Sequence, residues 1–137
     1  MKIYSFKSSS LSIPLISPGL SCGFPSPADD HLDEGIDLNR EYIRNKDATF
    51  FGRVRGDSMI GAGLEEGDLL IIDKSLEPRN GKIAVCFIDG EFTVKRIKIS
   101  EKTIWLTAEN ERYKPIQVTQ DNDFLIWGIV TTVIKDL

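Results

Sequence analysis

The chain has 137 residues, which suits one domain, and its hydrophobic fraction of 41% is sufficient for a core. A net charge of −4 argues against non-specific binding to nucleic acid or to a membrane surface. No apolar run reaches the roughly 18 residues that a membrane-spanning helix needs. Pro14 and Pro18 interrupt the first apolar stretch, so we expect no secretory signal and a cytoplasmic location.

The first 45 residues differ in composition from the rest. Prolines recur through this segment, and no sustained helical or strand period is present. Phe24-Pro25-Ser26-Pro27 should be extended, because a residue that precedes proline is driven out of the helical region. Residues 1–45 are therefore predicted to be a flexible, extended N-terminal arm, which a protease could bind as an added strand. A merely disordered terminus is the alternative.

Cysteine and histidine are scarce. Cys22 and Cys86 allow at most one disulfide, which a reducing compartment disfavours. Cys86 lies in the apolar run 83–88, where a buried thiol behaves as a small hydrophobic side chain. His31 is the single histidine, lies among acidic residues and has no Cys-x-x-Cys pair to accompany it. We therefore expect no metal site, no cofactor and no histidine-based catalytic triad.

Residues 46–137 are predicted to form a mostly β body. Asp89-Gly90 lies between two apolar runs, a strong signal for a two-residue hairpin. No long amphipathic helix is evident after residue 48. We expect a compact folded sheet or partial barrel. Its strands are predicted at residues 49–54, 69–72, 82–88, 91–99, 103–108 and 124–134.

Gly56-Asp57-Ser58-Met59 follows the first predicted strand of the body. Asp57 is a suitable helix N-cap, so Ser58 should begin a short helical turn from which its hydroxyl projects. Backbone N–H groups at the start of such a turn, those of Ser58 and Met59, could bind a developing oxyanion. The motif therefore indicates a candidate nucleophile. An ordinary capped turn is the alternative reading of the same residues.

A serine nucleophile requires a base, and lysine is the main candidate because histidine is effectively excluded. A lysine base must be neutral near pH 7, although its reference pKa is about 10.4, and burial can lower that pKa. In the strand 91–99, Phe92 and Val94 occupy one face, whereas Lys95 and Ile97 occupy the other. This strand therefore buries parts of both faces or contains a bulge. Either case can place Lys95 at a core edge, but a surface lysine remains open.

Two further features carry weaker signals. The Cys22-Gly23 bond joins small residues, which suit a narrow protease cleft, although many loops contain such residues. Asp68, with Glu65 and Glu66 nearby, could suggest an acidic metal site. Turn and solvent-face roles fit these acidic residues better, because no further ligands accompany them.

Taken together, these motifs resemble the LexA/UmuD group of self-cleaving Ser-Lys peptidases, and most closely the UmuD type, an accessory subunit of an error-prone DNA polymerase. The resemblance covers nearly the whole chain. It rests on the order and spacing of segments 22–28, 56–60, 67–71, 89–96 and 124–133. The resemblance implies a LexA/UmuD-like folded sheet.

The resemblance also implies a function and partners. Ser58 would be the nucleophile and Lys95 the base, and a RecA filament on single-stranded DNA would promote cleavage between Cys22 and Gly23. The truncated homodimer would then join a UmuC-type catalytic subunit for translesion DNA synthesis in the SOS response. Only about 45 residues precede the β body, and they contain no helix-turn-helix pattern. Direct sequence-specific DNA binding is therefore not expected.

Three other functions remain open from the sequence. A type I signal peptidase also pairs a Ser-Met motif with a lysine, but it would need a membrane anchor and an exported location. A polymerase-binding module with a decayed Ser-Lys pair would not cleave itself. A fragment of a phage or plasmid repressor would bind an operator directly.

Overall fold

The computed structural model describes residues 3–5, 11–16 and 32–137. The chain divides into two compact units: Met1–Phe6 together with Asn45–Leu137, and Lys7–Arg44. In the described ranges, no helix has both the length and the apolar character needed to span a membrane. The predicted positions Cys22, Gly23 and His31 lie outside the described residues.

The unit Lys7–Arg44 contains a small antiparallel hairpin and a short helix. Strands β2 (Ser12–Ile16) and β3 (Leu32–Asp37) pair with each other, and α1 (Leu38–Tyr42) follows directly. The Asp37 carboxylate accepts a hydrogen bond from the Asn39 N–H at 3.0 Å and so caps this helix. None of these elements was predicted from the sequence.

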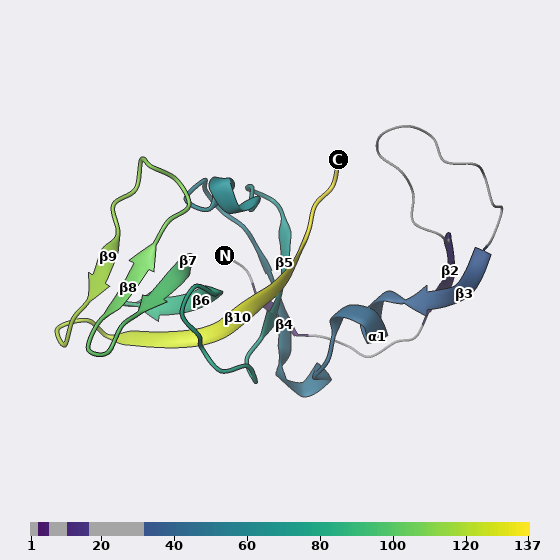
Figure 1. Cartoon of the computed structure of the whole chain (residues 1–137), viewed down its shortest axis with the longest axis horizontal. Helices are drawn as coiled ribbons and strands as arrows, with labels where there is room; N and C mark the ends of the chain where they lie inside the picture. Colours follow the sequence, from purple (N-terminus) through teal and green to yellow (C-terminus); the bar gives the residue numbers. More distant parts are fainter. Residues whose placement is uncertain (1–2, 6–10, 17–31) are drawn as a thin grey trace. The chain divides into compact units, whose positions relative to one another are not determined.

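The other unit is built on one eight-stranded antiparallel sheet, in which β10 lies between β5 and β6 (Figure 1). The strand order is β1-β4-β5-β10-β6-β7-β8-β9, which leaves β1 and β9 at the edges. The prediction of a mostly β fold is confirmed. The strands are β1 (Ile3–Ser5), β4 (Thr49–Arg53), β5 (Leu69–Asp73), β6 (Ile83–Ile88), β7 (Glu91–Ile99), β8 (Ile104–Thr107), β9 (Ile116–Val118) and β10 (Phe124–Ile134). Two short 3-10 helices, η1 (Lys46–Ala48) and η2 (Ile60–Ala62), accompany them.

The six strands predicted for the body correspond to β4, β5, β6, β7, β8 and β10, whereas β1 and β9 were missed. The predicted hairpin at Asp89-Gly90 is confirmed, because Ile88 pairs with Glu91 across it. Asp89 has φ 49° and Gly90 has φ 88°. Positive φ at both central residues defines the type I′ turn, whose twist matches that of the flanking strands.

Two apolar clusters stabilise the sheet, and β6 contributes to both. Val85 belongs to the cluster that contains Met59 and Leu70, whereas Ala84 and Cys86 belong to the cluster that contains Ile97. Because successive side chains of a strand point to opposite faces, an uninterrupted apolar run is expected where both faces are buried. The predicted burial of Cys86 is confirmed.

Strand β7 also contributes to both clusters. Val94 packs against the Met59 cluster, and Ile97 is part of the other cluster. The register of β7 against β6 runs without a shift from Glu91 to Arg96. The change of apolar parity near Lys95 therefore reflects burial on both faces, and no bulge is needed to explain it.

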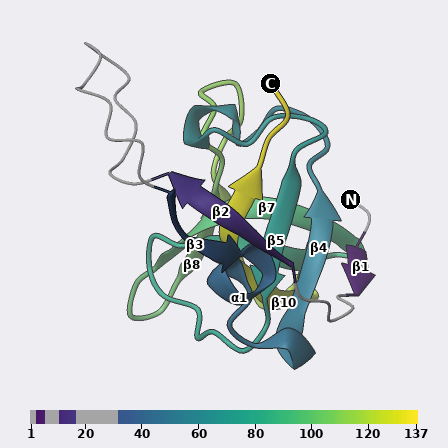
Figure 2. The same cartoon turned by 90° about the vertical axis from the view of Figure 1, so that its right-hand side faces the viewer.

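Figure 2 shows β4 and β5 side by side, as their antiparallel register requires.

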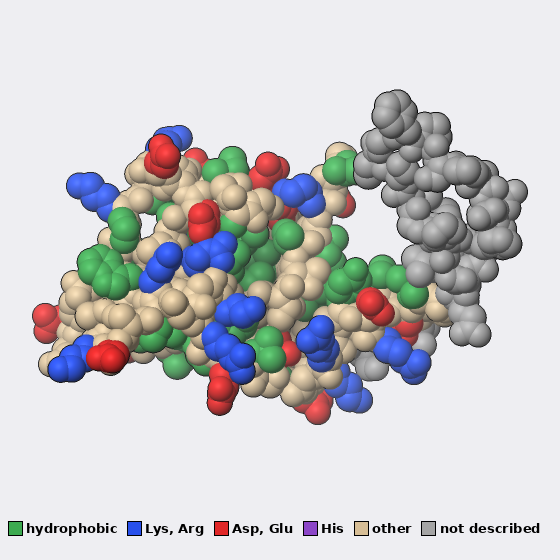
Figure 3. Space-filling model, in the orientation of Figure 1, with side chains coloured by type: hydrophobic (Ala, Val, Ile, Leu, Met, Phe, Trp, Pro, Cys, Tyr) green, Lys and Arg blue, Asp and Glu red, His purple; other side chains and the backbone are tan. Residues whose placement is uncertain are grey.

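The face of the molecule drawn in Figure 3 carries side chains of both charges. On the face drawn in Figure 3, Lys and Arg side chains are interspersed with Asp and Glu side chains. This distribution agrees with the modest net charge of −4.

Candidate active site

Ser58 lies in the connection between β4 and η2, where the chain leaves the sheet. Gly56 has φ 83°, a left-handed conformation that disfavours residues with a side chain. The following residue, Met59, is only 2% exposed and packs into an apolar cluster. The turn is therefore anchored through Met59, while the Ser58 side chain remains partly accessible.

The predicted capping role of Asp57 is wrong. The helical turn η2 begins at Ile60, with Met59 as its N-cap residue and no side-chain cap bond. The Asp57 carboxylate instead accepts a hydrogen bond from the Tyr113 hydroxyl, 56 residues away in sequence. A distant partner thus competes with the local capping geometry, and Ser58 lies just before the helical turn.

Lys95 lies on β7 and is 9% exposed. Its Nζ donates hydrogen bonds to Ser58 Oγ at 3.0 Å, to Thr93 Oγ1 at 2.8 Å and to the Val94 carbonyl oxygen at 3.2 Å. None of the described carboxylates forms an ion pair with this lysine. The alternative of a solvent-exposed Lys95 is therefore excluded by the observed burial.

Burial lowers the pKa of Lys95 from its ordinary value, because desolvation penalises the ammonium form and outweighs the opposing interaction with Cys86. Burial also raises the pKa of the Cys86 thiol to about 12, so that thiol stays protonated at neutral pH. The lysine thus contacts only uncharged acceptors, Ser58, Thr93 and Val94. This environment favours the neutral amine, the form that a general base requires.

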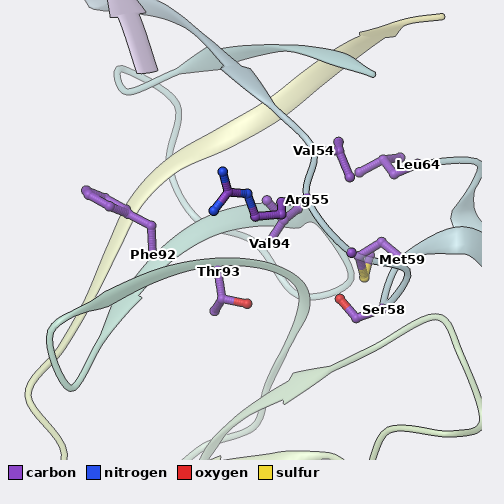
Figure 4. A pocket seen from close by; sticks show the side chains of 9 residues that line it. Val54, Arg55, Ser58, Met59, Leu64, Phe92, Thr93 and Val94 are labelled. Atoms are coloured by element: carbon purple, nitrogen blue, oxygen red, sulfur yellow. The ribbon is translucent and has the colours of Figure 1, made fainter. Parts of the chain in front are cut away.

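A pocket of about 170 Å³ lies beside the serine. Its apolar wall is formed by Val54, Met59, Leu64, Phe92 and Val94, and its polar wall includes Arg55, Ser58 and Thr93. In Figure 4 the hydroxyl groups of Ser58 and Thr93 point toward each other across the pocket. The pocket can therefore accept a side chain of modest size next to the serine hydroxyl.

The backbone around Ser58 offers donors for an oxyanion. Within the described part of the chain, the N–H groups of Ser58 and Met59 donate to no backbone acceptor. Unpaired N–H groups next to a nucleophile can stabilise negative charge on an attacked carbonyl oxygen. These two N–H groups are the ones that the sequence motif suggested.

The structure thus brings together Ser58, Lys95 and the Met59 N–H, and it adds Thr93, which the sequence analysis missed. A signal for Thr93 was present, because it precedes Lys95 by two residues and so lies on the same face of β7. Asp68 accepts hydrogen bonds from the Glu65 N–H and from Lys135, a structural role at a turn. Among residues 3–5, 11–16 and 32–137, no group of three or more His, Cys, Asp or Glu could hold a metal ion.

The sequence is similar to those of known proteins. The sequence pattern described as Peptidase S24-like matches residues 14–131. The chain is 42% identical to protein SamA of Salmonella typhimurium strain LT2 over 121 residues, which make up 88% of this chain and 84% of SamA. It is 37% identical to protein MucA of Escherichia coli over 136 residues, which cover 96% of this chain and 92% of MucA.

A third relative is the LexA repressor of Pseudomonas chlororaphis, 37% identical over 125 residues that make up 90% of this chain and 61% of the repressor. The resemblance to the LexA/UmuD group is therefore confirmed. The chain belongs to the Peptidase S24-like family.

Proposed function

We propose that this chain is a serine endopeptidase that cleaves itself once, at the Cys22-Gly23 bond, with Ser58 as nucleophile and Lys95 as general base. The observation that carries the proposal is the 3.0 Å hydrogen bond between Lys95 Nζ and Ser58 Oγ. The burial of Lys95, which lowers its pKa, supports the same role. Membership of a peptidase family is consistent with this chemistry.

The proposed reaction has two stages. Neutral Lys95 takes the proton of the Ser58 hydroxyl while Ser58 Oγ attacks the Cys22 carbonyl carbon. The N–H groups of Ser58 and Met59 stabilise the oxyanion, and the lysine then gives its proton to the Gly23 nitrogen as the peptide bond breaks. A water molecule, deprotonated by Lys95, next attacks the acyl-enzyme ester. This attack releases the Cys22 carboxylate and regenerates the Ser58 hydroxyl.

Covalent attachment of the substrate segment favours docking but also creates a need for control. A tethered segment has a high effective concentration near its own site, so tight peptide binding is unnecessary. Control would then rest on a substrate segment that is mostly undocked from the site in the uncut form. We propose that a RecA filament on single-stranded DNA stabilises the docked state and so shifts the population toward cleavage.

The product of this reaction carries the lasting function. We propose that the truncated chain remains a homodimer in the cytoplasm and joins a UmuC-type error-prone DNA polymerase subunit during the SOS response. The similarity of the chain to SamA, MucA and the LexA repressor supports this proposal. We expect it to act through protein partners, with no sequence-specific DNA binding and no membrane attachment of its own.

Mass spectrometry of the full-length protein, incubated with RecA, single-stranded DNA and ATP, tests the proposal. The wild-type protein should yield a fragment that begins at Gly23, and Ser58→Ala should yield none. Ser100→Ala is a matched control, because Ser100 also lies near a turn but contacts Thr103. A wild-type chain that stays intact would favour the non-cleaving polymerase-binding module, and cleavage of Ser58→Ala would exclude Ser58 as nucleophile.

A further inference from the structure

The loop of residues 109–113, here called the bracing loop, follows β8 and contacts the turn that carries Ser58. We propose that the bracing loop, through Asn110 above all, positions the Ser58 hydroxyl and the Ser58 N–H for catalysis. This inference rests on the proposed function of Ser58. Asn110 contacts none of the proposed reacting atoms, so its role is that of a positioning residue.

Asn110 holds the peptide unit that immediately precedes the nucleophile. Its Nδ2 donates a hydrogen bond to the Asp57 carbonyl oxygen at 3.0 Å. The Asp57 carbonyl and the Ser58 N–H belong to the same planar peptide unit and point in opposite directions. By fixing the carbonyl, Asn110 therefore fixes the direction of the N–H that would bind the oxyanion.

The same Asn110 side chain orders the bracing loop itself. Its Oδ1 accepts a hydrogen bond from the Arg112 N–H at 3.0 Å, and the backbone carbonyl oxygen of Asn110 accepts another from the Tyr113 N–H at 3.1 Å. The amide group is thus fixed at both ends, by its own turn and by Asp57. A side chain held in this way loses little further conformational freedom when it holds its partner.

Two more contacts join the bracing loop to the serine turn. The Tyr113 hydroxyl donates to Asp57 Oδ1, so both the side chain and the carbonyl of Asp57 are held by the loop. On the other side of Ser58, the Gly61 N–H donates to the Glu109 carbonyl oxygen at 2.7 Å. A Cβ atom at position 61 would lie 2.5 Å from that oxygen, so only glycine permits this approach. The turn is therefore held both before and after the nucleophile.

The bracing loop is also attached to the strand that carries the proposed base. The Glu109 carboxylate forms an ion pair with Arg96, the residue after Lys95 on β7. Thr107 Oγ1 donates a hydrogen bond to the Arg96 carbonyl oxygen at 3.1 Å, so the end of β8 also contacts Arg96. The loop thus links the Ser58 turn to β7, although the two catalytic candidates are 37 residues apart.

This link matters because proton transfer requires the two groups to stay within hydrogen-bond reach. A displacement of about 1 Å can cost roughly 100-fold in rate. Loss of the Asn110 contact leaves the Asp57 carbonyl oxygen with only the longer hydrogen bond from the Ile60 N–H at 3.3 Å, so the Asp57–Ser58 peptide unit should rotate more freely. Rotation would misdirect the oxyanion donor and loosen the Ser58–Lys95 hydrogen bond, while the burial of Lys95 in the sheet would be unchanged.

The test measures self-cleavage of the full-length chain at alkaline pH without RecA, as a function of pH. Asn110→Ala removes both contacts of the amide, whereas Asn110→Asp keeps the acceptor for the Arg112 N–H and loses only the donor to Asp57. Both variants should lower the plateau rate by about 10-fold to 100-fold. The pH of half-maximal rate should not move, since it reports the lysine.

Asn122→Ala is the matched control. Asn122 also braces a turn, accepting from the Thr119 N–H at 2.9 Å and donating to Asp89 Oδ2 at 2.7 Å, but it does not contact the Ser58 turn. The Asn122→Ala chain should cleave itself at the wild-type rate. Thermal unfolding of each variant shows whether the fold is retained. Wild-type plateau rates in both folded Asn110 variants would overturn the inference.

A second readout does not depend on cleavage. In a full-length Cys22→Ser, Ser58→Cys background, the rate of alkylation by iodoacetamide reports the pKa of the thiol introduced at position 58. The ammonium form of Lys95 at hydrogen-bond distance should hold that pKa below the free-cysteine value, and Asn110→Ala should raise it. Equal thiol pKa values with and without Asn110 would contradict positioning. The thiol pKa reports the geometry around position 58 whether or not the chain cleaves itself. A failure of positioning can therefore be distinguished from a failure of the proposed peptidase function, which Ser58→Ala tests.

Discussion

Lys95 and Lys135 are two lysines that the same fold places in opposite chemical situations. The Lys95 Nζ contacts two hydroxyl groups and one carbonyl, whereas the Lys135 Nζ contacts the carboxylates of Asp68 and Glu65. Burial lowers the pKa of Lys95. The hydrogen bond that Lys135 donates to the Asp68 carboxylate is the main cause of the raised pKa of Lys135.

The difference lies in the charge of the acceptors. A carboxylate stabilises the ammonium form, and in return Lys135 lowers the pKa of Asp68, helped by the Glu65 N–H. A hydroxyl group offers a hydrogen bond without a compensating charge, so desolvation dominates around Lys95. A lysine can thus serve as a base where only neutral acceptors surround it, and as an ion-pair partner where carboxylates do.

Removing the amine of Lys95 should impair self-cleavage severely, whereas removing that of Lys135 should not. Lys95→Met should reduce self-cleavage by about 100-fold to 10,000-fold, the usual contribution of a general base. Lys135→Met is the control: it removes the same type of cationic side chain at a position that does not contact Ser58. This variant should leave the rate of self-cleavage unchanged. Densitometry of cleavage time courses with RecA measures both. Comparable losses in the two variants would show that the lysines do not differ in function.

A second variant gives Lys95 a charged acceptor. Thr93→Asp places a carboxylate where the Thr93 hydroxyl now accepts from Nζ at 2.8 Å. This carboxylate should raise the pKa of Lys95 and slow cleavage at pH 8 by about 10-fold to 100-fold, with recovery at higher pH. Thr93→Asn has the same shape without the charge and should show no such alkaline shift. Identical pH profiles for the two variants would argue against electrostatic control of the base.

A smaller effect is expected in stability. Because the folded-state pKa of Lys95 is lowered, the unfolded chain binds more protons between that pKa and 10.5, and the stability contribution of Lys95 rises with pH in this window. Lys95→Met should therefore raise Tm at pH 7 by a few degrees, as expected when the free energy of unfolding changes by about 1 kcal/mol. This advantage should shrink as the pH approaches 10.5.

Lys135 should show the opposite sign. Its raised folded-state pKa gives stability that is complete below 10.5 and is lost as the pH rises through the folded value. Lys135→Met should therefore lower Tm at pH 7, and the deficit should diminish above pH 10.5. Differential scanning calorimetry of both variants across this range measures the two trends. Parallel curves with the same sign for both lysines would contradict the assigned pKa directions.

The sequence predicted the parts of the site that depend on local pattern. The parity of apolar residues around Lys95 indicated either burial on two faces of one strand or a bulge, and β7 has the first arrangement. Asp89-Gly90 specified its hairpin because the required backbone conformation is a property of those two residues. Local preference and tertiary structure agree at these positions.

The parts that were missed depend on distant contacts or on very short elements. Asp57 has the chemistry of a helix cap, but Tyr113 binds its carboxylate. Asn110 has no local signal for its contact with Asp57, because the two lie 53 residues apart. Strand β9 spans only Ile116–Val118 and is defined by its pairing with β8. No pattern in a single segment indicates such pairings.

The most direct test of the central claim is the rate of self-cleavage of the full-length chain, without RecA, measured from pH 6 to pH 11. If neutral Lys95 activates Ser58, the rate should rise about tenfold per pH unit and level off above one apparent pKa, which lies below the ordinary value for lysine. The Ser58→Ala chain should remain uncut throughout. A rate that stays flat between pH 7 and pH 10 would contradict the assignment of Lys95 as the base.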